Sequence, residues 1–199
     1  LASYGFVVIA PEHHEMYTQA LDWFWRAMIA RPQDILTVFE YVDAQTTAGG
    51  VLEGVIDPQT VAVIGHSLGG YTALAAAGAP INMESMAALC ESALEAADPA
   101  AWLCDLTLPY VAEMTALADL DAAPEGDWPV WADPRVDAIV PMAGDAYQFD
   151  PAGLAEIDIP VLAMGGTLDT GTPYHWGPLR TFEHVSSDRK AQLGFENAE

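Results

Sequence analysis

The sequence predicts an α/β fold in which a mostly parallel sheet is flanked by helices. Short apolar runs of strand length alternate with longer stretches whose apolar residues recur at helical spacing, as in β-α-β connections. The apolar runs are continuous, which favours strands covered on both faces. The chain has 199 residues and is 52% hydrophobic, so residues 1–199 are expected to form one domain with a substantial core.

The N-terminal part predicts one strand and two helices. Residues 1–5 are typical of the last turn of a helix that a glycine terminates, and because the chain does not start with Met we expect it to begin within a longer protein. Residues 5–10 are a continuous apolar run and are predicted to be a buried strand. Residues 16–30 have helical spacing up to a break at Pro32, which suits the first turn of a second helix over residues 33–45.

A serine lies at a predicted turn between a strand and a helix. Residues 60–64 are a largely β-branched apolar run that leads into Gly65-His66-Ser67-Leu68-Gly69, and an alanine-rich stretch follows to residue 79. This is the strand-turn-helix context in which the G-x-S-x-G pattern indicates a nucleophile, here Ser67. The alternative is a serine that caps the N-terminus of a buried helix.

Nucleophilic catalysis requires these residue types in this order. A serine hydroxyl is a weak nucleophile until a base accepts its proton, and a tight turn holds the oxygen where substrate and base reach it. The backbone amide of Leu68, at the start of the helix, is then placed to donate to the oxyanion that forms on the substrate. One such donor typically lowers the barrier by about 3 to 4 kcal/mol.

Residues 80–133 are too long for a plain connection and predict a helical cap inserted in the domain. Helical spacing covers residues 86–97 and, with an interruption at Pro109, residues 102–120. Two groups of aromatic residues are expected to pack in the core and the cap, with binding of an acyl chain as the alternative: the stretch Trp23, Phe24 and Trp25, and Trp102, Trp128 and Trp131 around the cap.

The two cysteines and the net charge bear on location and partners. Cys90 and Cys104 form either a disulfide, typically worth about 3 kcal/mol for a loop of this length and favouring a secreted or periplasmic location, or two buried thiols. A net charge of −23, with no Lys or Arg over residues 33–133, disfavours nucleic acid and anionic membranes as partners; we interpret it as a solubility or habitat feature. No apolar run is long enough to span a membrane.

Two aspartates follow predicted strands in the second half of the chain. Strands are predicted at residues 136–142, 160–166 and 191–195. Asp169 comes just after the second of these, and the carboxyl ends of parallel strands meet at one edge, so we expect Asp169 to orient a catalytic imidazole. Asp145 is the rival acid, and capping of a turn is the alternative role for Asp169.

The five histidines give no clear general base. His13, His14 and His66 are candidate pocket residues, although His66 beside the serine is expected to pack. His175 and His184 follow the predicted acid with no strand end to position them, and they are weaker candidates for the base. The histidines and cysteines lack the spacing of a metal site, so we expect neither a metal nor a cofactor.

Together these residues resemble the α/β-hydrolase superfamily, and more closely its group of predicted dienelactone hydrolases, which includes platelet-activating-factor acetylhydrolase-like and polyester-hydrolase-like enzymes. The resemblance implies Ser67 as nucleophile, Asp169 as triad acid and the Leu68 amide as oxyanion donor, without a cofactor. It implies that the family's first strands precede Leu1 and that the catalytic histidine follows Glu199, so residues 1–199 alone are expected to be inactive. The matching segments are residues 1–8, 31–35, 65–71, 133–136 and 159–169.

The expected function is hydrolysis of a small-molecule or polymeric carboxylic ester through an acyl-enzyme intermediate. The alternatives are a non-catalytic binding protein with the α/β-hydrolase fold, and an amide or carbon–carbon bond hydrolase that uses the same triad. The residues do not predict an oligomeric state.

Overall fold

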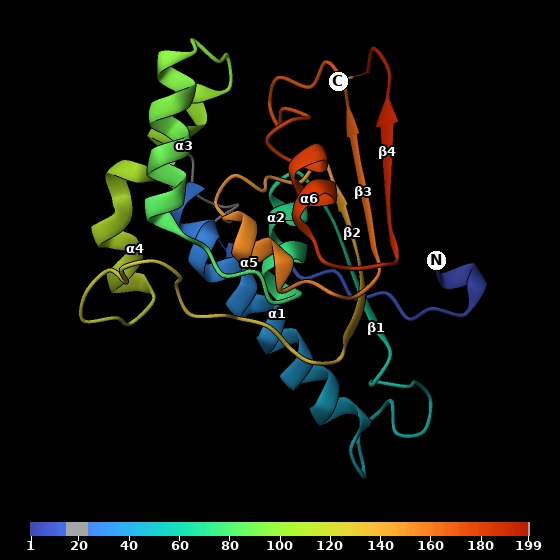
Figure 1. Cartoon of the computed structure of the whole chain (residues 1–199). Helices are drawn as coiled ribbons and strands as arrows, with labels where there is room; N and C mark the ends of the chain where they lie inside the picture. Colours follow the sequence, from blue (N-terminus) through green and yellow to red (C-terminus); the bar gives the residue numbers. More distant parts are fainter. Residues whose placement is uncertain (15–23, 199) are drawn as a thin grey trace.

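The computed structural model describes residues 1–14 and 24–198 (Figure 1). In this part of the chain the predicted α/β architecture is confirmed. The helical elements are η1 (Ala2–Tyr4), α1 (Phe24–Thr46), α2 (Leu68–Ala76), α3 (Met83–Glu95), η4 (Ala101–Leu106), η5 (Leu108–Tyr110), α4 (Val111–Leu117), α5 (Pro151–Ala155) and α6 (Pro178–His184). The strands are β1 (Val61–His66), β2 (Val136–Met142), β3 (Val161–Gly166) and β4 (Lys190–Phe195).

The four strands form one parallel sheet in the order β1-β2-β3-β4. They correspond to the strands predicted from the apolar runs that start near residues 60, 136, 160 and 191. Because all strands run in the same direction, their carboxyl ends lie at one edge, where His66 pairs with Met142 and Gly166 pairs with Phe195. Residues that follow the strands are therefore brought together at this edge.

Helices cover one face of the sheet in the described residues. α2 packs against β1 and β2, and α6 packs against β3 and β4 (Figure 1). On the other face Ile64 and Leu193 are 43% exposed and Leu162 is 36% exposed. The expectation that both faces are covered is thus not met within residues 1–14 and 24–198.

The strand predicted over residues 5–10 is wrong. These residues carry no strand assignment, and Phe6, Val7 and Val8 are exposed. A strand requires a hydrogen-bonded neighbour, and none of the described strands pairs with this segment. The helical turn predicted just before it is present as η1, which Gly5 ends with a φ of 88°.

The helix break predicted at Pro32 is also wrong, because α1 continues through it. Proline has no N–H to donate to the carbonyl four residues earlier, which here belongs to Met28. That carbonyl instead accepts a hydrogen bond of 2.7 Å from the buried hydroxyl of Tyr71 in α2. A tertiary contact replaces the lost helical bond. The predicted helical residues 16–23 lie outside the described part of the chain.

Residues 80–133 are largely helical, with α3, η4, η5 and α4 beside α1 (Figure 1). α4 packs against α1, and the rings of Trp25 and Tyr110 stack at 5.8 Å between centroids. Trp25 and Trp128 are buried, as the packing interpretation expects, whereas Trp102 is 46% exposed. Trp23 lies outside the described residues.

Among the described helices, none has the length and apolar composition that crossing a bilayer requires.

Candidate active site

Ser67 forms the turn between β1 and α2. Its backbone has φ 55° and ψ −121°, a conformation that non-glycine residues rarely adopt and that typically costs about 1–3 kcal/mol. Its N–H donates to the carbonyl of Met142 at the end of β2, over 2.8 Å. The packed sheet and helix therefore hold a strained serine at the carboxyl edge of the sheet.

The side chain of Ser67 does not cap α2. Its hydroxyl makes no capping bond to the helix, and in residues 1–14 and 24–198 it has no hydrogen-bond partner. The capping interpretation of this serine is therefore not supported. The residue is partly buried, so its hydroxyl is held in place by the backbone and not by a side-chain bond.

Glycines allow the turn to be this tight. A Cβ atom on Gly65 would lie 2.1 Å from the carbonyl oxygen of Gly69, and one on Gly70 would lie 2.4 Å from the Cα atom of Gly144. Both distances are far below van der Waals contact. The small residues that flank Ser67 are thus required for β1, α2 and the loop after β2 to approach one another.

Leu68 is the first residue of α2 and its side chain is buried. The first N–H groups of a helix have no acceptor within the helix, and the helix dipole adds positive potential at this end. The amide of Leu68 therefore stands directly beside the serine at an end of the helix that favours negative charge.

Asp169 lies three residues beyond the end of β3. Its Oδ1 accepts hydrogen bonds of 2.8 Å from the N–H groups of Gly171 and Thr172. The turn-capping role considered as the alternative is thus present for this oxygen. Within the described residues Oδ2 accepts no hydrogen bond, so the carboxylate is oriented by one oxygen while the other is not engaged.

Asp145, three residues beyond the end of β2, is the most deeply buried carboxyl group at this edge. It is 3% exposed, and its Oδ1 has no hydrogen-bond partner in the described residues. Burial, and to a lesser extent the charge of Asp169, raises the pKa of Asp145 to about 7. Asp145 is therefore more deeply buried than Asp169, which is only partly buried.

The three candidate pocket histidines are dispersed. His66 ends β1 and is exposed, and His14 is exposed as well. His13 bonds through Nδ1 to Oδ2 of Asp34 in α1, at 2.6 Å. His13 also lines an apolar cleft of about 560 Å³ that runs along the outer edge of β1 and includes Gly69.

Neither later histidine is placed to act on Ser67. His175 bonds through Nε2 to Oδ2 of Asp98, at 2.9 Å, and is half exposed. His184 ends α6, which starts near the carboxyl ends of the strands and leads back to the start of β4. It therefore lies toward the opposite edge of the sheet from Ser67.

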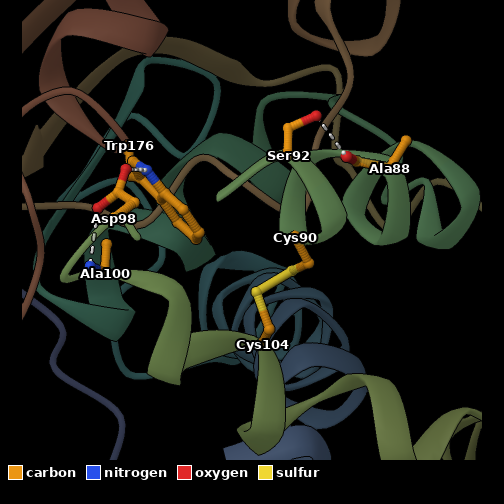
Figure 2. The surroundings of a disulfide bond; sticks show 7 residues. All are labelled: Ala88, Cys90, Ser92, Asp98, Ala100, Cys104 and Trp176. Atoms are coloured by element: carbon orange, nitrogen blue, oxygen red, sulfur yellow. Dashed lines mark hydrogen bonds between the residues drawn. A yellow bond between two sulfur atoms is a disulfide. The ribbon is translucent and has the colours of Figure 1, made fainter. Parts of the chain in front are cut away.

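The helical segment of residues 80–133 is joined to the loop that follows Asp169. Cys90 and Cys104 form a disulfide, which decides between the two alternatives for these residues (Figure 2). Asp98 lies between the two cysteines in the sequence. It accepts hydrogen bonds from Nε1 of Trp176 at 3.1 Å and from the N–H of Ala100 at 2.8 Å. Burial raises the pKa of Asp98, but these two hydrogen bonds and the bond from His175 outweigh burial and hold that pKa below its ordinary value.

Sequence reasoning missed the role of Asp98 and the burial of Tyr147. No local pattern marks this role, because the side-chain partners of Asp98, His175 and Trp176, lie 77 and 78 residues away along the chain. Tyr147 comes shortly after a predicted strand, as Asp145 does, and this position in the sequence could have marked Tyr147 as a residue of the same edge. Its hydroxyl is buried without a well-formed hydrogen bond in the described residues, and burial raises its pKa well above the ordinary value.

Comparison of this chain with protein-family models and with curated proteins gave no match.

Proposed function

We propose that this protein is a serine hydrolase of the α/β-hydrolase superfamily that cleaves small-molecule or polymeric carboxylic esters. The observation that carries the proposal is the conformation of Ser67, a strained non-glycine residue between a strand and a helix at the carboxyl edge of a parallel sheet. Strain of this kind persists only where the surrounding structure enforces it, and it concentrates at functional sites. A serine with no side-chain bond has no structural need for this geometry.

In the proposed reaction, Oγ of Ser67 attacks the ester carbonyl carbon while a histidine accepts its proton. Asp169 orients that imidazole and stabilises its cationic form, and the amide of Leu68 donates to the oxyanion. The imidazolium returns the proton to the departing alcohol. Water then attacks the acyl-enzyme with the same base, which releases the carboxylic acid and restores Ser67. The reaction uses no cofactor.

The backbone after β4 supports a place for that histidine directly after Glu199. The N–H of Leu168 donates to the carbonyl of Ala198 at 2.9 Å, and the N–H of Asn197 donates to Oγ1 of Thr167 at 3.0 Å. The loop after β4 is thus paired with the residues immediately before Asp169. A histidine that follows Glu199 would lie beside the carboxylate that must orient it.

The open edge of β1 is consistent with the larger fold that the proposal implies. In the described residues β1 pairs only with β2, and its other edge faces the apolar cleft lined by Val8 and Ile9. Parallel sheets are usually covered on both faces, and an edge strand presents unpaired N–H and C=O groups to which a further strand can bond. We propose that the family's first strands, which would precede Leu1, pair at this edge and that a loop among them supplies a second oxyanion amide.

The Cys90–Cys104 disulfide is compatible with a location outside the cytoplasm. We propose that the protein is secreted or periplasmic.

A fluorophosphonate probe tests the function, because it reacts covalently with activated serines. The protein that includes its natural residues beyond Glu199 is expected to be labelled, and Ser67→Ala is expected to abolish the labelling. Asp169→Asn should slow it strongly, whereas Asp158→Asn, an exposed carboxylate, should not. Residues 1–199 alone are expected to remain unlabelled. Lack of labelling of the longer protein would refute the proposal.

A non-catalytic binding protein is the second candidate. The observation in its favour is that no described histidine bonds to Ser67 or Asp169. A longer protein that lacks a histidine after Glu199 and does not react with the probe would establish it. Comparison of p-nitrophenyl esters with anilides would separate an esterase from an amide hydrolase on the same triad.

A further inference from the structure

Asp145 stands between the two residues that we propose as nucleophile and acid. Ser67 follows β1, Asp145 follows β2 and Asp169 follows β3, and β2 is the strand between the other two. All three residues come just after the carboxyl end of a parallel strand. The sheet thus places the carboxyl group of Asp145 at the centre of the edge where the reaction is proposed to occur.

The loop that carries Asp145 is forced into this position. Ala143 has a φ of 44°, and its N–H donates to the carbonyl of Met164 in β3. A Cβ atom on Gly144 would lie 2.8 Å from the Cα atom of Gly70, so this residue is wedged against the start of α2. The backbone is strained and tightly packed, yet it delivers a carboxyl group whose Oδ1 finds no partner in the described residues.

No positive charge compensates Asp145 in the described residues. Asp169 acts on it from the loop after β3, and Tyr147 lies close to it on its own loop. The guanidinium of Arg180 in α6 bonds to the carbonyls of Ala146 and Phe149 and not to this carboxyl group. A buried carboxylate without a cation or a hydrogen-bond donor is strongly disfavoured, and a second negative charge nearby increases the penalty.

We infer that Asp145 is a positioning residue of this site, whose buried carboxyl group carries a proton and so adds no negative charge of its own beside Ser67. This inference rests on the proposed function for its purpose. A second negative charge would oppose the oxyanion that forms next to Leu68, and the protonated carboxyl group avoids that charge. Ionisation of Asp145 is then expected to slow acylation of Ser67.

Carboxyl titration tests the inference without turnover. In protein labelled with ¹³C at the aspartate carboxyl groups, one resonance is expected to titrate near neutral pH in the wild type and in Asp158→Asn. It should be missing in Asp145→Asn and should titrate at lower pH in Asp169→Asn, because a neighbouring charge has been removed. If no carboxyl group titrates above the ordinary range, or if Asp169→Asn leaves its midpoint unchanged, the inference is overturned. The Asp169→Asn arm decides the matter even if Asp145→Asn does not fold.

The rate of fluorophosphonate labelling against pH gives a second readout in the longer protein. The wild-type rate is expected to fall as Asp145 ionises, and Asp145→Asn should remove that fall while Asp158→Asn retains it. A wild-type fall that persists in Asp145→Asn would overturn the proposed role in acylation. Because the titration is measured separately, failure of Ser67 to react would count against the hydrolase proposal and not against the proton on Asp145.

Discussion

Replacement of Asp145 by Asn is expected to change how the stability of this protein depends on pH. Burial, together with the charge of Asp169, raises the pKa of Asp145 from 3.8 to about 7 in the folded protein. Between these two values the folded state binds one more proton at this site than the unfolded state does. The contribution of this proton to the free energy of unfolding is therefore fully present below the pKa that Asp145 has in the unfolded state. It is lost as pH rises through the pKa that Asp145 has in the folded state. Asn cannot titrate, so the variant lacks this dependence.

The size of the effect follows from the difference between the two pKa values. One pKa unit corresponds to about 1.4 kcal/mol, so a difference of about three units amounts to about 4 kcal/mol over the whole range. The protein has an isoelectric point of about 4.1, where it is expected to associate. Measurements are therefore better made from about pH 5 upward. Above that pH the free energy of unfolding is still expected to change by about 3 kcal/mol.

Urea unfolding followed by tryptophan fluorescence at pH 5, 6, 7 and 8 measures this difference. The stability of the wild type minus that of Asp145→Asn should fall steadily from pH 5 to pH 7 and level off by pH 8. The same difference taken against Asp158→Asn, an exposed carboxylate, should stay nearly constant. A wild-type-minus-Asn difference that is flat, or that rises with pH, would show that Asp145 is ionised in the folded protein and would refute the reasoning.

Three further substitutions test other parts of the structure. Ser67→Gly should be more stable than Ser67→Ala by about 1 kcal/mol, because glycine adopts positive φ freely; equal urea midpoints would contradict the strain at Ser67. Cys90→Ser combined with Cys104→Ser should lower the free energy of unfolding by about 3 kcal/mol, and dithiothreitol should destabilise the wild type similarly without affecting the double variant. Tyr71→Phe should cost about 1–3 kcal/mol, because the Met28 carbonyl loses its donor; Tyr41→Phe, at an exposed ring, is the control, and equal thermal midpoints for the two would count against that bond.

The features predicted correctly from the sequence are those that a few neighbouring residues determine. The four strands were visible as apolar runs of strand length, and the turn at Ser67 was visible because glycines and a serine separate a strand from a helix. Gly65 and Gly70 have to be small for the backbones to approach, and this requirement appears directly in the sequence. The carboxyl edge of the sheet then follows from parallel pairing, which places Asp145 and Asp169 at the same edge as the turn.

The features that could not be predicted depend on partners far away in the chain. Residues 5–10 have the composition of a strand, but composition does not supply the neighbour that a strand must bond to. Pro32 has the character of a helix breaker, and only the position of Tyr71 shows how its missing hydrogen bond is replaced. The choice between paired and free cysteines likewise depended on how α3 and η4 meet.

The loop that carries Asp169 is fixed by contacts from three parts of the fold, which links the disulfide to the proposed chemistry. The loop after β4 holds its start through Ala198, and the loop after β2 holds its far end, where the N–H of Ala146 donates to the carbonyl of Trp176. Asp98, in the helical segment of residues 80–133, binds Trp176 and lies on the stretch that the Cys90–Cys104 disulfide closes. Because a misplaced catalytic group loses rate steeply with distance, the contact of Asp98 with Trp176 is expected to act on the orientation of Asp169, the proposed triad acid, as well as on stability. The disulfide is therefore expected to stabilise the surroundings of the proposed triad acid, although neither cysteine takes part in the proposed reaction.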